Sequence, residues 1–153
     1  MEKVTTGNPE RHNSLLLEDQ LCFALYAASR AVTVRYRPLL DALGLTYSQY
    51  LVMLALWERD ALSVSNLGAA LHLESSTLSP LLKRLEANGL VLRERRADDE
   101  RSVTVRLTGA GANLREKART VPFAIGEAMN LTPEQDAAAK HLLRLITTNV
   151  TRG

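Results

Sequence analysis

Residues 71–107 read LHLESSTLSPLLKRLEANGLVLRERRADDERSVTVRL, and the hydrophobic period of this stretch changes once along its length. In its first half, leucines recur at helical spacing and predict an amphipathic helix with one apolar stripe: Leu78, Leu81, Leu82 and Leu85. Asn88 and Gly89 then form a strong stop signal. Beyond them, LVLRERR and SVTVRL alternate with a period of two around the charged turn ADDER, which predicts a β-hairpin.

Two further helices are predicted on the N-terminal side of this stretch. Thr46 can cap the first helix, Gln49 can complete a capping box three residues later, and the apolar pattern continues to about Arg59. Ser63 can cap a second, short helix. A helix, a short helix, a turn, a helix and a two-stranded hairpin follow one another in a winged helix-turn-helix, so we expect this unit over residues 46–107.

The flanking segments are also predicted to be helical, which makes the fold class mainly α with a small β-hairpin. Helical periodicity runs over residues 15–43, with Pro38 expected to kink it and Gly44 to end it. Residues 1–14 are polar, and we expect a flexible arm there. Thr108 is expected to begin a long helix, broken or bent near Pro122, and TPEQ from Thr132 to begin a last helix that ends at about Val150.

Composition limits the classes of protein to consider. A chain of 153 residues with 46% hydrophobic and 24% charged residues is typical of one globular domain, with or without dimerising arms. A formal charge of +2 permits nucleic-acid binding without implying it. A single cysteine excludes an intramolecular disulfide, and we see no signal peptide or membrane span, so we expect a cytoplasmic protein. The three histidines show no metal-ligand spacing, and we expect no metal and no cofactor.

Two groups of residues are candidates for contact with DNA. Small hydroxyls at the start of the helix after residue 74 would let its backbone approach a base edge or a phosphate, and basic side chains follow on the same helix and at the hairpin tip. The candidates are Ser75, Ser76, Thr77, Ser79, Lys83, Arg84, Arg95, Arg96 and Arg101. Two alternatives remain open, because the hydroxyls could be a capping cluster and the hairpin charges, five arginines against four acids over residues 93–106, could be a solvated face or a protein-interaction surface.

The segment quoted above, continued by TGAG, resembles the DNA-binding core of the MarR family of bacterial repressors. Asp99-Glu100-Arg101 is similar to the wing motif of that family, in which the Asp braces the hairpin and the Arg reaches DNA. The resemblance covers residues 18–150 and implies a homodimer. Residues 15–45 and 108–153 would form its dimerisation region, and its two winged domains would bind a pseudo-palindromic operator in double-stranded DNA.

Within that family, DQLCFALYAASRAV resembles the branch that senses organic hydroperoxides, usually called OhrR. The resemblance implies that Cys22 is the redox-active residue and that Tyr36 and Tyr47 hold its thiolate, with Tyr26 lining the same pocket. Tyr36 lies fourteen residues beyond Cys22, so an unbroken helix would separate their backbones by about 21 Å. A contact between them would therefore have to join two subunits, and residues 15–45 would form a combined sensing and dimerisation helix.

The chemistry of such a sensor makes clear demands on the surroundings of Cys22. The thiolate is the nucleophile, and phenol donors favour it, whereas Glu18 and Asp19 would oppose it if they shared its helix face. We expect an apolar surround of Phe23, Leu25 and Met53. With one cysteine per chain, the sulfenic acid would react with a small cellular thiol or be oxidised further, as the resemblance to one-cysteine members implies.

Three other functions remain open. A MarR-like repressor could respond to a small phenolic or acidic ligand with an inert, buried Cys22, and a winged helix could serve protein interaction instead. A one-cysteine thiol peroxidase would need a thioredoxin-like alternation of strands and helices, which the pattern lacks. We therefore expect a regulator and not an enzyme.

Overall fold

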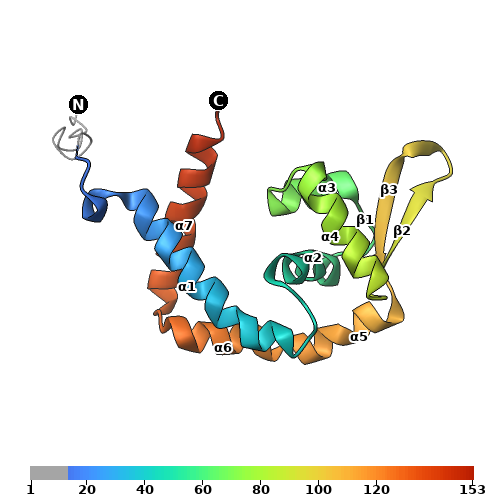
Figure 1. Cartoon of the computed structure of the whole chain (residues 1–153), viewed down its shortest axis with the longest axis horizontal. Helices are drawn as coiled ribbons and strands as arrows, with labels where there is room; N and C mark the ends of the chain where they lie inside the picture. The colour runs from blue at the N-terminus through green and yellow to red at the C-terminus, as the bar shows by residue number, and fades with distance from the viewer. Residues whose placement is uncertain (1–13) are drawn as a thin grey trace.

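The computed structural model describes residues 14–153, and it confirms a mainly helical chain with a small antiparallel sheet (Figure 1). All but one residue of the arm expected at residues 1–14 lies outside the described residues. The elements follow in the order η2 (Leu17–Asp19), α1 (Leu21–Asp41), α2 (Tyr47–Glu58), β1 (Leu62–Ser63), α3 (Val64–Leu71), α4 (Ser75–Ala87), β2 (Val91–Arg96), β3 (Asp99–Leu107), α5 (Gly109–Ala118), α6 (Thr120–Met129) and α7 (Pro133–Val150).

The predicted winged helix-turn-helix is confirmed, with α2, α3 and α4 packed together and against the hairpin. Figure 1 shows this unit on one side of the molecule, α1 and α7 on the other, and α5 and α6 along the edge that connects them. Each fully buried aliphatic side chain of its core contributes about 1.5–3 kcal/mol. These core side chains include Val52, Met53, Leu56, Leu67, Leu78, Leu82, Leu85, Val91 and Val105.

The sheet has one strand more than the sequence pattern predicts. Its order is β1-β3-β2, and Leu62 of β1 pairs with Val105 of β3. The hairpin turn is also shorter than expected, because β3 already begins at Asp99 and Arg96 pairs with it. The expected five-residue turn ADDER is therefore wrong, and residues 97 and 98 connect the two strands.

The local signals at helix starts are confirmed. Thr46 and Gln49 form the expected capping box at the start of α2, and Thr132 and Gln135 form another at the start of α7. Ser63 caps α3 by accepting a hydrogen bond from the backbone N–H of Asn66 at 3.0 Å. These side chains satisfy N–H groups that have no partner inside the helix, which is why sequence alone locates them well.

One expected helix boundary is wrong. The first helix begins at Leu21 and not at residue 15, because the backbone at Gln20 is extended (φ −87°, ψ 107°) and separates α1 from the short 3-10 turn η2. The break expected near Pro122 is confirmed, because two helices, α5 and α6, follow Thr108 and part at Arg119. Pro122 has no N–H to donate to Ala118 and so favours this break.

The helices outside the winged unit carry many exposed apolar side chains. In α7 no residue is buried, although its leucines recur at helical spacing. Exposed apolar residues of α1, α6 and α7 include Leu21, Phe23, Val34, Phe123, Met129, Leu142, Leu143 and Leu145. Over residues 14–153, no helix is long and apolar enough to cross a membrane.

Candidate functional site

Cys22 is the second residue of α1, and its side chain is exposed. A structural thiol buried within a single chain is therefore excluded. Glu18 and Asp19 belong to η2, on the other side of the extended Gln20, so they do not occupy the same helical face as Cys22. The condition under which they would oppose the thiolate, a shared helix face with Cys22, is therefore not met.

Tyr36 and Tyr47 come together at the opposite end of α1. Their ring centroids lie 4.9 Å apart, and Tyr50, one turn further along α2, lies 5.7 Å from Tyr36. The row continues to Trp57, whose ring centroid is 6.5 Å from that of Tyr50. Trp57 in turn donates a hydrogen bond from Nε1 to the carbonyl of Gly111 in α5, at 2.9 Å.

Burial raises the pKa of two tyrosines of this row, Tyr36 and Tyr50. Desolvation, followed by the neighbouring Tyr47, raises the pKa of Tyr36 above its ordinary value. Desolvation, followed by Tyr36 and Tyr47, raises the pKa of Tyr50 to about 12. Tyr36 and Tyr50 are therefore neutral at physiological pH, and their hydroxyls can donate hydrogen bonds to an anion.

The structure keeps Cys22 apart from Tyr36, as the spacing predicts. Helix α1 runs without interruption from Leu21 to Asp41. The backbones of the two residues are consequently about 21 Å apart along its axis. A hollow of about 260 Å³ lies beside Tyr47 and is also lined by Thr33, Arg37 and Leu40. No residue from the N-terminal turns of α1, where Cys22 lies, lines this hollow.

The side chains around Cys22 differ in part from expectation. Phe23 is exposed and Leu25 is half-buried, so both are available near the thiol. Met53 is fully buried in the core of the winged unit, and its expected place in an apolar pocket around the thiol is wrong. Tyr26, 58% exposed, lies one turn after Cys22 and accepts a hydrogen bond from Nη1 of Arg30 at 3.4 Å.

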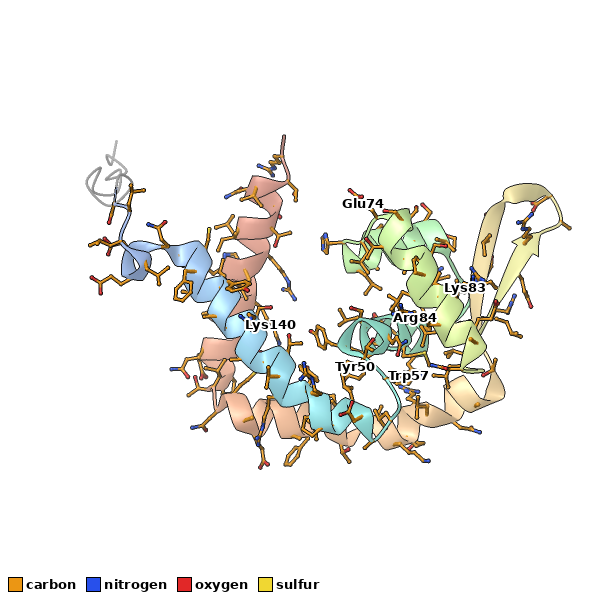
Figure 2. All side chains as sticks on the ribbon, in the orientation of Figure 1. Tyr50, Trp57, Glu74, Lys83, Arg84 and Lys140 are labelled. Atoms are coloured by element: carbon orange, nitrogen blue, oxygen red, sulfur yellow. The ribbon has the colours of Figure 1, made fainter. Side chains whose placement is uncertain are left out.

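The outer face of α4 presents the hydroxyls and basic residues that we expect to contact DNA. Ser75, Ser76, Thr77, Ser79, Lys83 and Arg84 are all exposed, while Leu78, Leu82 and Leu85 point into the core. Glu74 is the N-cap residue and makes no capping bond with its side chain. None of the four hydroxyls bonds to another residue whose side chain the structure describes, which argues against a capping cluster. Figure 2 shows Glu74 at the start of α4 and Lys83 further along it.

A groove of about 780 Å³ separates the start of α4 from the wing. Serine residues from four elements line it: Ser63 of β1, Ser65 of α3, Ser75 and Ser79 of α4, and Ser102 of β3. Arg93 lines the same groove. A channel between a helix and a hairpin with these hydroxyls and one basic residue in its lining can accommodate the backbone of a nucleic acid.

The wing is only partly described. Arg95 is exposed, as expected for a residue that contacts DNA. The side chains of Arg96, Asp99 and Arg101 lie outside the described residues, so the expected bracing and DNA contacts of these three stay predictions.

Two wing arginines have a role that sequence reasoning missed. Arg93 pairs with Glu86 of α4 at 3.1 Å, and Arg106 pairs with Glu94 across the hairpin at 3.1 Å. The register explains the second pair, because Arg106 faces Leu92 and lies diagonal to Glu94. Counting charges along the chain could not show these pairs.

The fold and the exposed α4 face define a winged helix-turn-helix regulator. The chain matches the family model described as Transcriptional regulator SarA/Rot over residues 35–118, more than half its length, and it belongs to this family of transcriptional regulators. It is 51% identical over 115 residues to the Organic hydroperoxide resistance transcriptional regulator of Bacillus subtilis (strain 168), covering 75% of this chain and 78% of the relative. The resemblance to the OhrR branch of the MarR family, expected from the sequence, is thereby confirmed.

Solved structures agree with this assignment. The overoxidised AbfR bound to DNA, a protein of Staphylococcus epidermidis, is 39% identical with a TM-score of 0.73, covering 86% of this chain and 93% of AbfR. MarR is 20% identical with a TM-score of 0.70, covering 87% of this chain and 98% of MarR, and it shares the fold. The relatives are regulators, so the chain is a transcriptional regulator rather than an enzyme.

Proposed function

We propose that the chain is a transcriptional repressor that senses organic hydroperoxides by oxidation of Cys22 and then releases its operator. The observation that carries this proposal is the separation of two half-sites along α1. An exposed thiol occupies its first turn, and the Tyr36–Tyr47 pair occupies its far end. Neither half has its partner within the chain.

A homodimer with crossing α1 helices would complete both half-sites. The thiol of Cys22 would reach the hollow beside Tyr47 of the second subunit, where the phenol of Tyr47 and that of the adjacent Tyr36 could donate to the thiolate. The exposed apolar residues of α1 and α7 support residues 15–45 and 108–153 as the dimerisation region. Tyr26 would line the same pocket from the subunit that carries the thiol.

In the reduced dimer, the two α4 helices would enter successive major grooves of a pseudo-palindromic operator. Their hydroxyls would contact base edges or phosphates, and Lys83, Arg84 and Arg95 would contact phosphates. We place Arg96 and Arg101 at DNA, and Asp99 as the brace of the wing, on the basis of the resemblance alone. The AbfR relative supports DNA binding by this fold.

Oxidation would break the thiolate–phenol bonds and so change how the two winged units are held. Because the chain has one cysteine, the sulfenic acid would react with a small cellular thiol to give a mixed disulfide, or be oxidised further. AbfR is bound to DNA in its overoxidised form. We therefore favour the bulkier mixed disulfide as the form that releases the operator.

Operator binding by the purified dimer tests this proposal. The wild type and Cys22→Ser are titrated with an organic hydroperoxide in the presence of a small thiol. We expect the wild type to lose the operator and Cys22→Ser to keep it. Retention by the wild type after complete conversion of Cys22 to the mixed disulfide would refute the proposal. Equal release of both proteins would instead indicate a repressor in which a ligand acts and Cys22 is inert.

The partner tyrosines allow a second test with mixed dimers. In a heterodimer of Cys22→Ser and Tyr36→Phe chains, the single intact thiol faces the intact Tyr36 of the other subunit, and the second site has lost both groups. We expect this thiol to react at the wild-type rate. A thiol that reacts at the slow rate of the Tyr36→Phe homodimer would contradict a site shared between subunits.

A further inference from the structure

Cys22, Tyr26 and Arg30 follow one another at intervals of four residues along α1. Each therefore lies about 40° around the helix from the one before, and the three share one face. Long side chains on a helix lean back toward its N-terminus, onto the residue one turn earlier. Arg30 thus leans on Tyr26, and Tyr26 leans toward the turn that carries Cys22.

The contact between Arg30 and Tyr26 has two components. Nη1 of Arg30 donates to Oη of Tyr26 at 3.4 Å, and the guanidinium carbon lies 5.5 Å from the ring centroid. No carboxylate pairs with Arg30 among the residues that the structure describes, so its charge is not neutralised by a neighbour. Because the phenol oxygen accepts from Arg30, its own hydrogen is free to be donated elsewhere.

The sensing reaction requires such a donor. When the Cys22 thiolate attacks the terminal oxygen of an alkyl hydroperoxide, an S–O bond forms and the O–O bond breaks. The sulfur is oxidised to the sulfenic acid, and the electron pair of the O–O bond leaves on an alkoxide. An alkoxide is a strongly basic leaving group, so a proton delivered as the O–O bond breaks lowers the barrier.

We propose that Tyr26 supplies this proton and that Arg30 is the positioning residue that makes it an effective acid; this inference rests on the function proposed above. Tyr26 gives its hydroxyl proton to the alkoxide, which leaves as the alcohol. The phenolate that forms is stabilised by the Arg30 guanidinium until water returns a proton to it. Tyr36 and Tyr47 of the second subunit then have the separate task of holding the thiolate before attack.

The choice of oxidant separates proton delivery from thiolate stabilisation. An alkyl hydroperoxide releases an alkoxide, which needs a proton, whereas a peroxy acid releases a carboxylate, which does not. A group that only holds the thiolate affects both reactions equally. A group that protonates the leaving group affects the first reaction alone.

The experiment measures the rate of Cys22 sulfenic acid formation in the full-length reduced dimer, with cumene hydroperoxide and with peracetic acid. We expect Tyr26→Phe to slow the reaction with cumene hydroperoxide by about a hundredfold and to leave the peracetic acid reaction near the wild-type rate. Arg30→Gln is expected to give the same pattern, more weakly, and Arg30→Lys to restore part of the rate. Arg35→Gln, a matched charge removal on the opposite side of α1, should leave both rates unchanged.

Operator binding by each reduced variant confirms that it is folded. Equal slowing with both oxidants would overturn the inference, because Tyr26 would then act only on the thiolate. Unchanged rates in Tyr26→Phe and Arg30→Gln would overturn it as well. Failure of the wild type to react with either oxidant would instead refute the proposed sensing function, so the two failures are distinguishable.

Discussion

Glu86 and Arg93 tie the α4 helix to the wing through two hydrogen bonds. Oε2 of Glu86 accepts from the backbone N–H of Arg93 at 2.9 Å, and Oε1 accepts from its guanidinium at 3.1 Å. One carboxylate near the end of α4 therefore fixes both the main chain and the side chain of β2. Residues of both elements line the groove of about 780 Å³, so loss of this contact should change the width of the groove.

Replacement of Glu86 by Gln should loosen the wing relative to α4. The guanidinium and the backbone N–H of Arg93 hold the pKa of Glu86 below its ordinary value. A carboxylate whose pKa is lowered in the folded state stabilises the fold above its unfolded pKa, and this stabilisation is lost as the pH falls through the folded pKa. We expect the Arg93 amide to be less protected from hydrogen exchange, relative to its intrinsic rate at the same pH, in Glu86→Gln at neutral pH, and in the wild type only on acidification.

Glu116→Gln provides the control for this variant. Glu116 pairs with Arg119 at 3.2 Å through two largely exposed side chains, so its loss should leave the wing unaffected. Operator affinity should fall by a factor of a few in Glu86→Gln and remain unchanged in Glu116→Gln. An Arg93 amide that exchanges equally slowly in both variants would show that the pair does not hold the hairpin.

Gly111 is predicted to tolerate no side chain. A Cβ at this position would clash with the carbonyl oxygen of Leu90, which is backbone at the base of the wing and cannot move aside cheaply. We expect Gly111→Ala to lower the free energy of unfolding by about 3 kcal/mol, at the upper end of overpacking effects. Urea denaturation followed by fluorescence of Trp57, the single tryptophan, measures it directly.

Gly109, in the same first turn of α5, is the matched position. A Cβ there meets nothing within 4 Å, so Gly109→Ala should be neutral or stabilise the fold by up to about 1 kcal/mol. If the two variants were equally stable, the close packing of α5 against the base of the wing would be contradicted.

The sequence predicts those features that depend on local side chains and on distance along one helix. Capping by Thr46 and by Thr132 involves residues three positions apart, so the pattern locates both helix starts. The separation of Cys22 from Tyr36 follows from the rise of one helix. The order of elements was likewise sufficient to predict the winged unit.

The features that the sequence does not predict depend on contacts between distant segments. Strand β1 has two residues and exists because Leu62 and Ser63 pair with β3, some forty positions later. The helix start expected at residue 15 was wrong. The leucines at 15–17 extend the apolar pattern toward the N-terminus, but α1 itself begins only at Leu21. Met53 resembled a pocket residue, but its neighbours in space are the core leucines.

Lys83 is predicted to contact a DNA phosphate without reading sequence. Each phosphate contact releases counterions and contributes about −0.9 to the slope of log affinity against log salt concentration. A dimer carries two copies of Lys83, so Lys83→Ala should make this slope shallower by about 2 and weaken binding to all operator sequences alike. Lys140→Ala also removes one positive charge, but from α7, which lies away from the α4 face (Figure 2). This variant should leave the slope unchanged. Operator titrations from low to moderate salt measure the slope; equal slopes in Lys83→Ala and the wild type would place Lys83 away from the phosphates.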